Sequence, residues 1–125
     1  MICSHVLEHV DDDAAAMREL CRITSACGWC MIMVPLDLSR AQTYEDPSID
    51  TPQARERAYW QHDHVRLYGA DVGERLTAAG FLVEQISPAE EFGPQAMTRC
   101  RLLATDHIWL CRPRRGWRSP PPEHL

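Results

Sequence analysis

A continuous apolar run from Trp29 to Val34 restricts the possible folds of this chain more than any other feature. The run has the length of a strand, and its apolar side chains do not alternate with polar ones, which is typical of a strand covered on both faces. Pro35 ends it, because proline has no N–H to donate to a strand ladder. Such strands occur mainly where helices cover both faces of a largely parallel sheet, so the run predicts an α/β fold.

The rest of the chain supplies elements for such a fold. Asp11, Asp12 and Asp13 can cap and complement a helix start, and apolar residues follow them at helical spacing. Gly80 is well placed to end a later helix. The order of the elements implies a sheet built partly from right-handed crossovers, while the segment 88–106 shows no clear pattern. We expect helices at 11–24, 52–59 and 71–80, and strands at 1–4, 29–34, 81–86 and 107–112.

Two segments differ in composition from these elements. Residues 38–64 are mainly polar and form a long excursion, of a length that is usually functional or disordered in compact domains. Residues 113–125 are rich in Arg and Pro, which predicts a disordered or polyproline-like tail. We therefore expect one domain at 1–112 that contains the excursion.

The composition excludes several classes of protein. A chain with 45% apolar and 25% charged residues is typical of soluble globular domains, and its net charge of -5 argues against nucleic acid as a partner. No apolar run approaches the roughly 20 residues of a membrane helix, and the N-terminus shows no signal-peptide pattern. We expect a cytoplasmic protein without a membrane partner, whose six cysteines are free thiols.

Three ordered motifs between residues 2 and 35 carry a family resemblance. They match a strand end of the form S-x-V-L-E-H-V, a helix with M-R-E-L-x-R-x-L, and a turn and strand of the form K-P-G-G-W followed by V-P. Their order and spacing resemble the class I S-adenosylmethionine-dependent methyltransferases of the type 11 family, and TYEDPSI, QHDHVRLYG and ERLTAAGF extend the resemblance to about residue 86. The matching residues are Ser4, Val6 to Val10, Met17 to Leu20, Arg22, Gly28, Trp29, Val34 and Pro35.

The resemblance implies a partial Rossmann-like methyltransferase sheet flanked by helices, mostly parallel with an antiparallel final strand. It implies S-adenosylmethionine as the cofactor and methyl transfer, with a small molecule expected as the acceptor. The glycine-rich loop and the ribose-binding acid of that family would precede Met1. We therefore expect the C-terminal half of such a domain, with weak or absent cofactor binding by this half alone.

An incomplete sheet would leave the strand at 1–4 with an unpaired edge. Such edges tend to pair with other chains. We expect a homo-oligomer, or a complementing N-terminal fragment, at this edge. The alternative function is a non-catalytic α/β remnant that acts through self-association or as a partner subunit.

The resemblance also places a site at the end of the first strand. It implies that Ser4, His5, Val6 and Leu7 line the methionine part of the cofactor. His5, Glu8 and His9 are the implied catalytic residues, with His5 or His9 as a base for an oxygen or nitrogen nucleophile. The alternative is that Glu8 and His9 only fix the loop through hydrogen bonds.

A second polar cluster follows the excursion, and the resemblance places it on the substrate side. Its candidates are Asp63, His64, Arg66 and Tyr68. Arg66 has the geometry to hold an anionic group with two hydrogen bonds, and Tyr68 to orient a nucleophile. The alternative is a hydrogen-bonded corner that fixes the excursion to the sheet.

Two further motifs are short enough to match a known pattern by chance. His5 to His9 form H-x-x-E-H, an order used by one group of zinc peptidases, but that chemistry needs both histidines on one helix face. Since the motif starts at a strand end, the preferred interpretation is a site without metal, and a metal-dependent site at His5, Glu8 and His9 is the third alternative function. Cys27 to Cys30 form C-x-x-C, yet they follow a helix end and not a helix start, so structural cysteines are expected.

Overall fold

The computed structural model describes residues 1–115. The helices and strands predicted from sequence are present with bounds that differ by one or two residues, and an additional helix occupies the segment without a clear pattern. Pro113 ends the last strand, and the rest of the predicted tail, from 116 on, lies outside the described residues. The elements are β1 (Ile2–Ser4), the 3-10 turn η1 (Leu7–His9), α1 (Asp13–Ile23), β2 (Cys30–Met33), α2 (Pro52–Tyr59), α3 (Val72–Ala78), β3 (Phe81–Ile86), α4 (Pro88–Cys100) and β4 (Ile108–Pro113).

The strands form one sheet in the order β1-β2-β4-β3. β1 and β2 run parallel, while β4 runs antiparallel to both of its neighbours, β2 and β3. β3 therefore has the direction of β1 and β2, and the final strand alone is reversed. This confirms the predicted α/β class with a mostly parallel sheet and an antiparallel final strand. Among the described residues, the outer edge of β1 pairs with no other strand.

Helix ends follow the signals in the sequence. The side chain of Asp12 accepts a hydrogen bond of 2.9 Å from the backbone N–H of Ala15, and so caps α1. Of the three aspartates that precede the apolar spacing, Asp12 is the capping residue. Gly80 follows α3 with a φ of 110°, a left-handed conformation that glycine adopts without strain.

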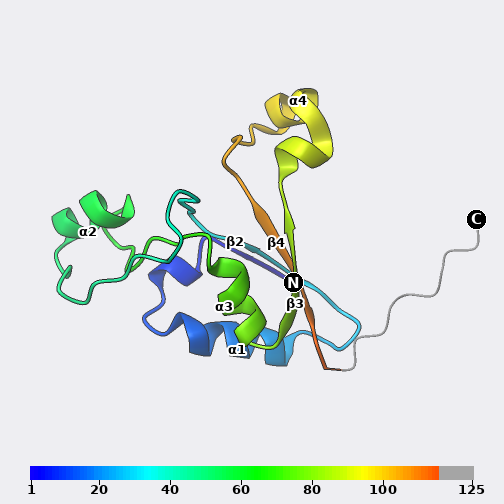
Figure 1. Cartoon of the computed structure of the whole chain (residues 1–125), viewed down its shortest axis with the longest axis horizontal. Helices are drawn as coiled ribbons and strands as arrows, with labels where there is room; N and C mark the ends of the chain where they lie inside the picture. The colour runs from blue at the N-terminus through cyan, green and yellow to red at the C-terminus, as the bar shows by residue number, and fades with distance from the viewer. Residues whose placement is uncertain (116–125) are drawn as a thin grey trace, which may run out of the picture.

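One face of the sheet carries the hydrophobic core. Side chains from alternate strand positions are buried there against Met17 and Cys21 of α1 and Val72 and Leu76 of α3. Figure 1 shows that α1 and α3 lie on the same side of the sheet. The sheet residues of this covered face are Cys3, Cys30, Ile32, Phe81, Trp109 and Cys111.

The opposite face of the sheet carries apolar side chains beside the charged pair of Glu84 and Arg112, and the described residues cover it only partly. Ile2, Met31 and Leu110 form one row across the strands, with Ile2 65% exposed. Met33 and Ile108 on the same face are partly buried. The apolar run of β2 predicted cover on both faces, but in this structure α1 and α3 cover one face only. We call Ile2, Met31, Met33, Ile108 and Leu110 the uncovered face.

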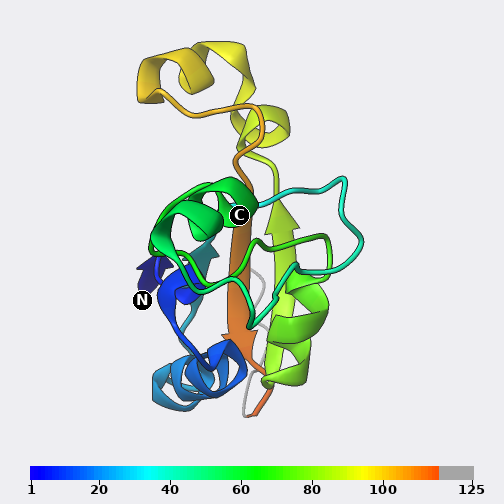
Figure 2. The ribbon, with the colours of Figure 1, turned by 90° about the vertical axis from the view of Figure 1, so that its left-hand side faces the viewer.

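The excursion packs against the sheet end, whereas α4 stands away from it. Backbone bridges join Leu36 to Tyr68 and Tyr44 to Leu67, and they hold the two ends of the excursion together. Figure 2 shows α4 projecting beyond the ends of β3 and β4. Gly93, with a φ of 76°, and Pro94 break α4 into two helical pieces.

No helix among the described residues has the length and apolar character needed to cross a membrane.

Candidate functional site

A pocket of about 210 Å³ lies where the parallel strands β1 and β2 end. Ligands of open α/β sheets bind outside the carboxyl ends of the strands, so its position makes it the first candidate for a binding site. His5 leaves β1 with a φ of 55°, an uncommon conformation for a residue other than glycine, and its side chain lines the pocket. We call this the strand-end pocket; its lining residues are His5, Met33, Val34, Pro35, Leu36, Trp60, Leu103, Thr105, Asp106 and His107.

Several residues of the strand-end pocket were not found by sequence reasoning. Trp60 comes from the end of α2, and Asp106 and His107 come from the segment between α4 and β4. These segments carry no recognisable motif, and they reach the ends of β1 and β2 only through the fold. The signal available in sequence was their polar or aromatic character, which does not indicate a shared pocket.

The predicted cofactor residues Ser4, His5, Val6 and Leu7 do not all have the same environment. Ser4, His5 and Val6 are exposed after β1, whereas the side chain of Leu7 belongs to the core and is 1% exposed. The backbone carbonyl of Leu7 accepts a hydrogen bond of 2.6 Å from Arg66 Nη1. Leu7 therefore has neither a free side chain nor a free carbonyl to offer to a ligand.

Glu8 lies at the centre of a cluster of imidazoles. Its carboxylate is buried, and Oε1 lies 3.5 Å from His5 Nδ1 and 3.7 Å from His9 Nε2. His64 is also buried, and its ring meets that of His9 edge to face, with centroids 4.7 Å apart. The predicted catalytic residues and His64 of the predicted substrate side thus lie together. We call His5, Glu8, His9, Asp63 and His64 the Glu8 cluster.

Hydrogen bonds on the outside of this cluster orient two of the imidazoles. His64 Nδ1 lies 2.9 Å from the carbonyl oxygen of Tyr59, which can only accept, so this nitrogen carries the hydrogen. His9 Nδ1 lies 3.4 Å from the carboxylate of Asp63. Gln61 donates to that carboxylate, and this hydrogen bond holds the pKa of Asp63 below its usual range. Backbone pairing brings the two segments together, since the N–H of Val65 donates to the carbonyl of Glu8 at 2.8 Å.

Arg66 and Tyr68 form a buried corner between the first strand end and the excursion. The guanidinium of Arg66 is 3% exposed and donates to the carbonyls of Leu7, Val10 and Asp11 and to the carboxylate of Glu45. Tyr68 donates to Asp13 Oδ2 at 2.7 Å, and burial, reinforced by Asp13, raises the pKa of its hydroxyl. In this arrangement both side chains bind protein groups, which favours the corner over a direct role in substrate binding.

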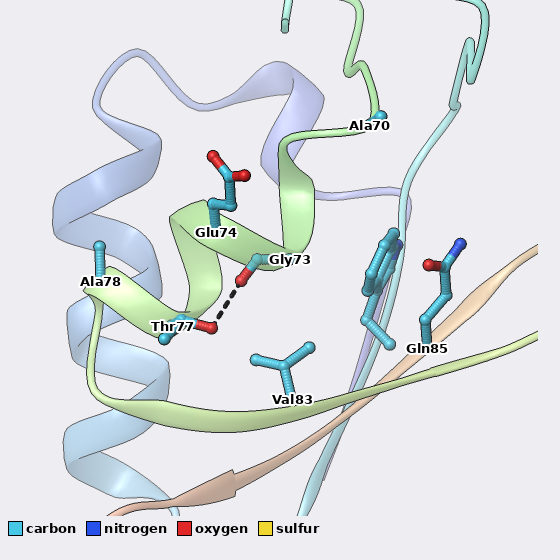
Figure 3. Close-up of a pocket in the computed structure, with 8 residues that line it drawn as sticks. Ala70, Gly73, Glu74, Thr77, Ala78, Val83 and Gln85 are labelled. Carbon is cyan, nitrogen blue, oxygen red and sulfur yellow. Dashed lines mark hydrogen bonds between the residues drawn. The ribbon is translucent and has the colours of Figure 1, made fainter. Parts of the chain in front are cut away.

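A second hollow lies between α3 and β3, outside the strand ends. Figure 3 shows Gly73, Glu74, Thr77 and Ala78 of α3 on one side of it and Val83 and Gln85 of β3 on the other. Thr77 Oγ1 donates to the carbonyl of Gly73 at 2.8 Å, so this hydroxyl is already engaged. Among the described residues that line this hollow, Glu74 is the one acidic group, and none of the others is a second titratable group.

The cysteines of the C-x-x-C motif differ in their surroundings. Cys27 is exposed, while Cys30 is buried in β2, where burial raises the pKa of its thiol to about 11. A redox pair needs a thiol with a lowered pKa. The expected structural role therefore fits this geometry, and all six cysteines are free thiols.

These features define an α/β protein with a candidate ligand pocket at the ends of its parallel strands and a histidine-carboxylate cluster beside it. No protein-family model matches the sequence, and no curated protein matches it. Among solved structures, the chain is similar to one described as the crystal structure of the [4+2]-cyclase SpnF, with 17% sequence identity and a TM-score of 0.47. The match covers 90% of this chain and 48% of that one, so the chain spans about half the length of the solved structure.

Proposed function

We propose that this chain is the later half of an S-adenosylmethionine-dependent methyltransferase domain, and that its strand-end pocket receives the methyl acceptor. The observation that carries this proposal is the position of the H-V-L-E-H-V segment. The residues that give the family resemblance leave the carboxyl end of a parallel strand, beside a pocket, in a sheet whose final strand alone is reversed. Such a position is where an open α/β sheet binds its ligand.

In this proposal the cofactor supplies the methyl group, and the chain positions the acceptor and accepts its proton. His5 lines the pocket and is exposed enough to meet an acceptor hydroxyl or amine. Glu8 Oε1 lies 3.5 Å from His5 Nδ1 and helps to orient the imidazole that accepts the proton. Trp60 and Leu103 give the pocket apolar walls, although both side chains are also exposed to solvent.

We propose further that the cover for the uncovered face and a partner for the edge of β1 come from outside residues 1–125. The family's glycine-rich loop and ribose-binding acid would belong to the same additional segment. The row of Ile2, Met31 and Leu110, which is exposed at Ile2 and partly buried at the other two residues, supports this, because apolar faces of this kind are normally packed against other elements. The same surface favours the second candidate function, a remnant that acts through self-association.

Calorimetric titration with S-adenosylhomocysteine tests the proposed function. We expect weak or absent binding by the chain alone, and micromolar binding once it is fused to the segment encoded in frame upstream of it. His5→Ala should lower the rate of methyl transfer in the fused protein while the affinity for S-adenosylhomocysteine changes little. His62→Ala is the matched control, because His62 is exposed and lines no part of the pocket.

The outcomes separate the candidate functions. Micromolar binding by the isolated chain would contradict the proposal that a further segment is needed. No binding by the fused protein would contradict methyl transfer and leave the self-associating remnant as the better account.

A further inference from the structure

The carboxylate of Glu8 is buried without a hydrogen-bond donor. Its residue is 1% exposed, and neither Oε1 nor Oε2 receives a hydrogen bond from any described residue. Buried carboxylates in proteins are paired with a cation or bind a metal, because an isolated charge in the interior is strongly unfavourable. The structure therefore leaves two buried carboxyl oxygens without a partner, and a cation is one group that would satisfy them.

Two histidines, His9 and His64, each bring a ring nitrogen to within 4.8 Å of this carboxylate. His64 Nδ1 donates to the carbonyl of Tyr59, so its Nε2 carries a lone pair in the neutral ring. His9 Nδ1 faces the carboxylate of Asp63, which leaves Nε2 toward Glu8, 3.7 Å from Oε1. Ring nitrogens that carry lone pairs and a carboxylate are all acceptors, and a cation shared among them would satisfy them together.

We infer that Glu8, His9 and His64 bind a divalent transition-metal ion of the zinc class. One ligand atom from each residue lies within 4.8 Å of the others. Bonds of roughly 2.0–2.2 Å to nitrogen and oxygen place the ligands of a tetrahedral ion about 3.3 Å apart, so the three groups need only close in slightly. Tyr59 and Asp63 hold the far side of each imidazole, as outer-shell groups do in metal sites.

The ligand set differs from the H-x-x-E-H pattern in the sequence. That pattern pairs His5 with His9, whereas the geometry replaces His5 with His64, which lies 55 positions after His9 in the chain. His5 has an exposed side chain and lies between Glu8 and the strand-end pocket. Three protein ligands leave a coordination position open, which suits a water or a ligand group. The inference does not rest on methyl transfer.

Binding of Co²⁺ as a spectroscopic probe, with Zn²⁺ as its competitor, tests the site. We expect the chelator-stripped chain to bind one equivalent of Co²⁺ with visible d-d bands and without the charge-transfer band of a thiolate ligand. Zn²⁺ should displace it. Glu8→Gln and His64→Asn should each weaken binding by more than about 100-fold, and Asp63→Asn by about 10–100-fold, since outer-shell groups contribute less than ligands.

Matched controls exclude other histidines and thiols. His62→Ala removes an exposed histidine two positions from His64, and Cys27→Ser removes an exposed thiol; neither should change Co²⁺ affinity. A thiolate charge-transfer band, or binding that is lost in Cys27→Ser, would overturn the proposed site. Equal affinities for the wild-type chain and Glu8→Gln would overturn it too.

Thermal unfolding distinguishes a metal from the other possible cation, a proton shared among the histidines. If a metal is the partner, Zn²⁺ should raise the melting temperature of the wild-type chain but not that of Glu8→Gln, and without metal Glu8→Gln should melt at or above the wild type. If protonated histidines neutralise Glu8, Glu8→Gln should melt lower and Zn²⁺ should shift neither protein. The second pattern rejects the metal site.

Discussion

At the scale of single residues, Arg66 shows how a polar side chain in a candidate site can have a structural function. Its guanidinium joins the loop after β1 to the excursion through the carbonyls of Leu7, Val10 and Asp11. The Glu8 cluster lies directly beside this joint, because Val65, which precedes Arg66, bonds to the backbone of Glu8. Arg66 thereby sets the position of His64 relative to Glu8.

Replacing Arg66 by Ala should lower the free energy of unfolding by about 3 kcal/mol or more, since each buried carbonyl left without a donor costs about 1–3 kcal/mol. Urea denaturation followed by circular dichroism measures the change. Arg22→Ala is the matched control, because Arg22 pairs with Glu19 on an exposed helix surface and should have little effect. If Arg66→Ala and the wild type have the same midpoint urea concentration of unfolding, the corner is not structural.

Sequence patterns marked the residues of the Glu8 cluster but not their arrangement. The resemblance indicated His5, Glu8, His9, Asp63 and His64, in two groups with separate roles. Their meeting depends on contacts between segments more than 50 positions apart, of which the bond from Val65 to Glu8 is one. No local pattern predicts such a contact, so the sequence did not indicate that His64 lies beside Glu8 together with His5 and His9.

At the scale of elements, α1 illustrates where local signals suffice. Its apolar spacing and aspartate-rich start predicted the helix, and Asp12 supplies the cap. α4 illustrates where they fail. Gly93 and Pro94 interrupt it, and most of its surface is exposed, so neither a continuous helical spacing nor an apolar face is visible in the sequence.

Asp12→Ala should destabilise the chain by about 1 kcal/mol, which is typical of the loss of an N-cap hydrogen bond. Asp11→Ala is the control, because it removes the same charge from the adjacent, equally exposed position without removing a cap. The midpoint of thermal unfolding, compared among the two variants and the wild type, gives the result. Equal losses in both variants would indicate that charge near the helix start, and not the cap, is responsible.

At the scale of the whole molecule, helices among the described residues pack on one face of the sheet and leave the other face without such cover. Core packing is confined to the side of α1 and α3, while the uncovered face meets the free edge of β1 at Ile2. The apolar character of β2 predicted that both of its faces need cover. Helices cover one face as predicted, while cover on the second face stays a prediction, since the described residues do not provide it.

The edge of β1 is suited to pairing with another strand. Met1 and His5 make the backbone bonds to β2, and in a parallel ladder such bonds come from alternate residues, so the N–H groups of Ile2 and Ser4 point outward. Ile2 adds an exposed apolar side chain at the same place. We therefore predict that the chain self-associates at this edge as its concentration rises.

Ile2→Lys should shift the association toward monomer, because a lysine at a sheet edge opposes pairing with a second chain through its charge and solvation. Ile23→Lys is the matched control: Ile23 is 55% exposed, close to the exposure of Ile2, but it lies at the end of α1 and outside the uncovered face. Sedimentation velocity over a range of concentrations measures both variants beside the wild type. A wild-type chain that stays monomeric throughout, or equal dissociation by the two lysines, would show that the edge of β1 is not an association surface.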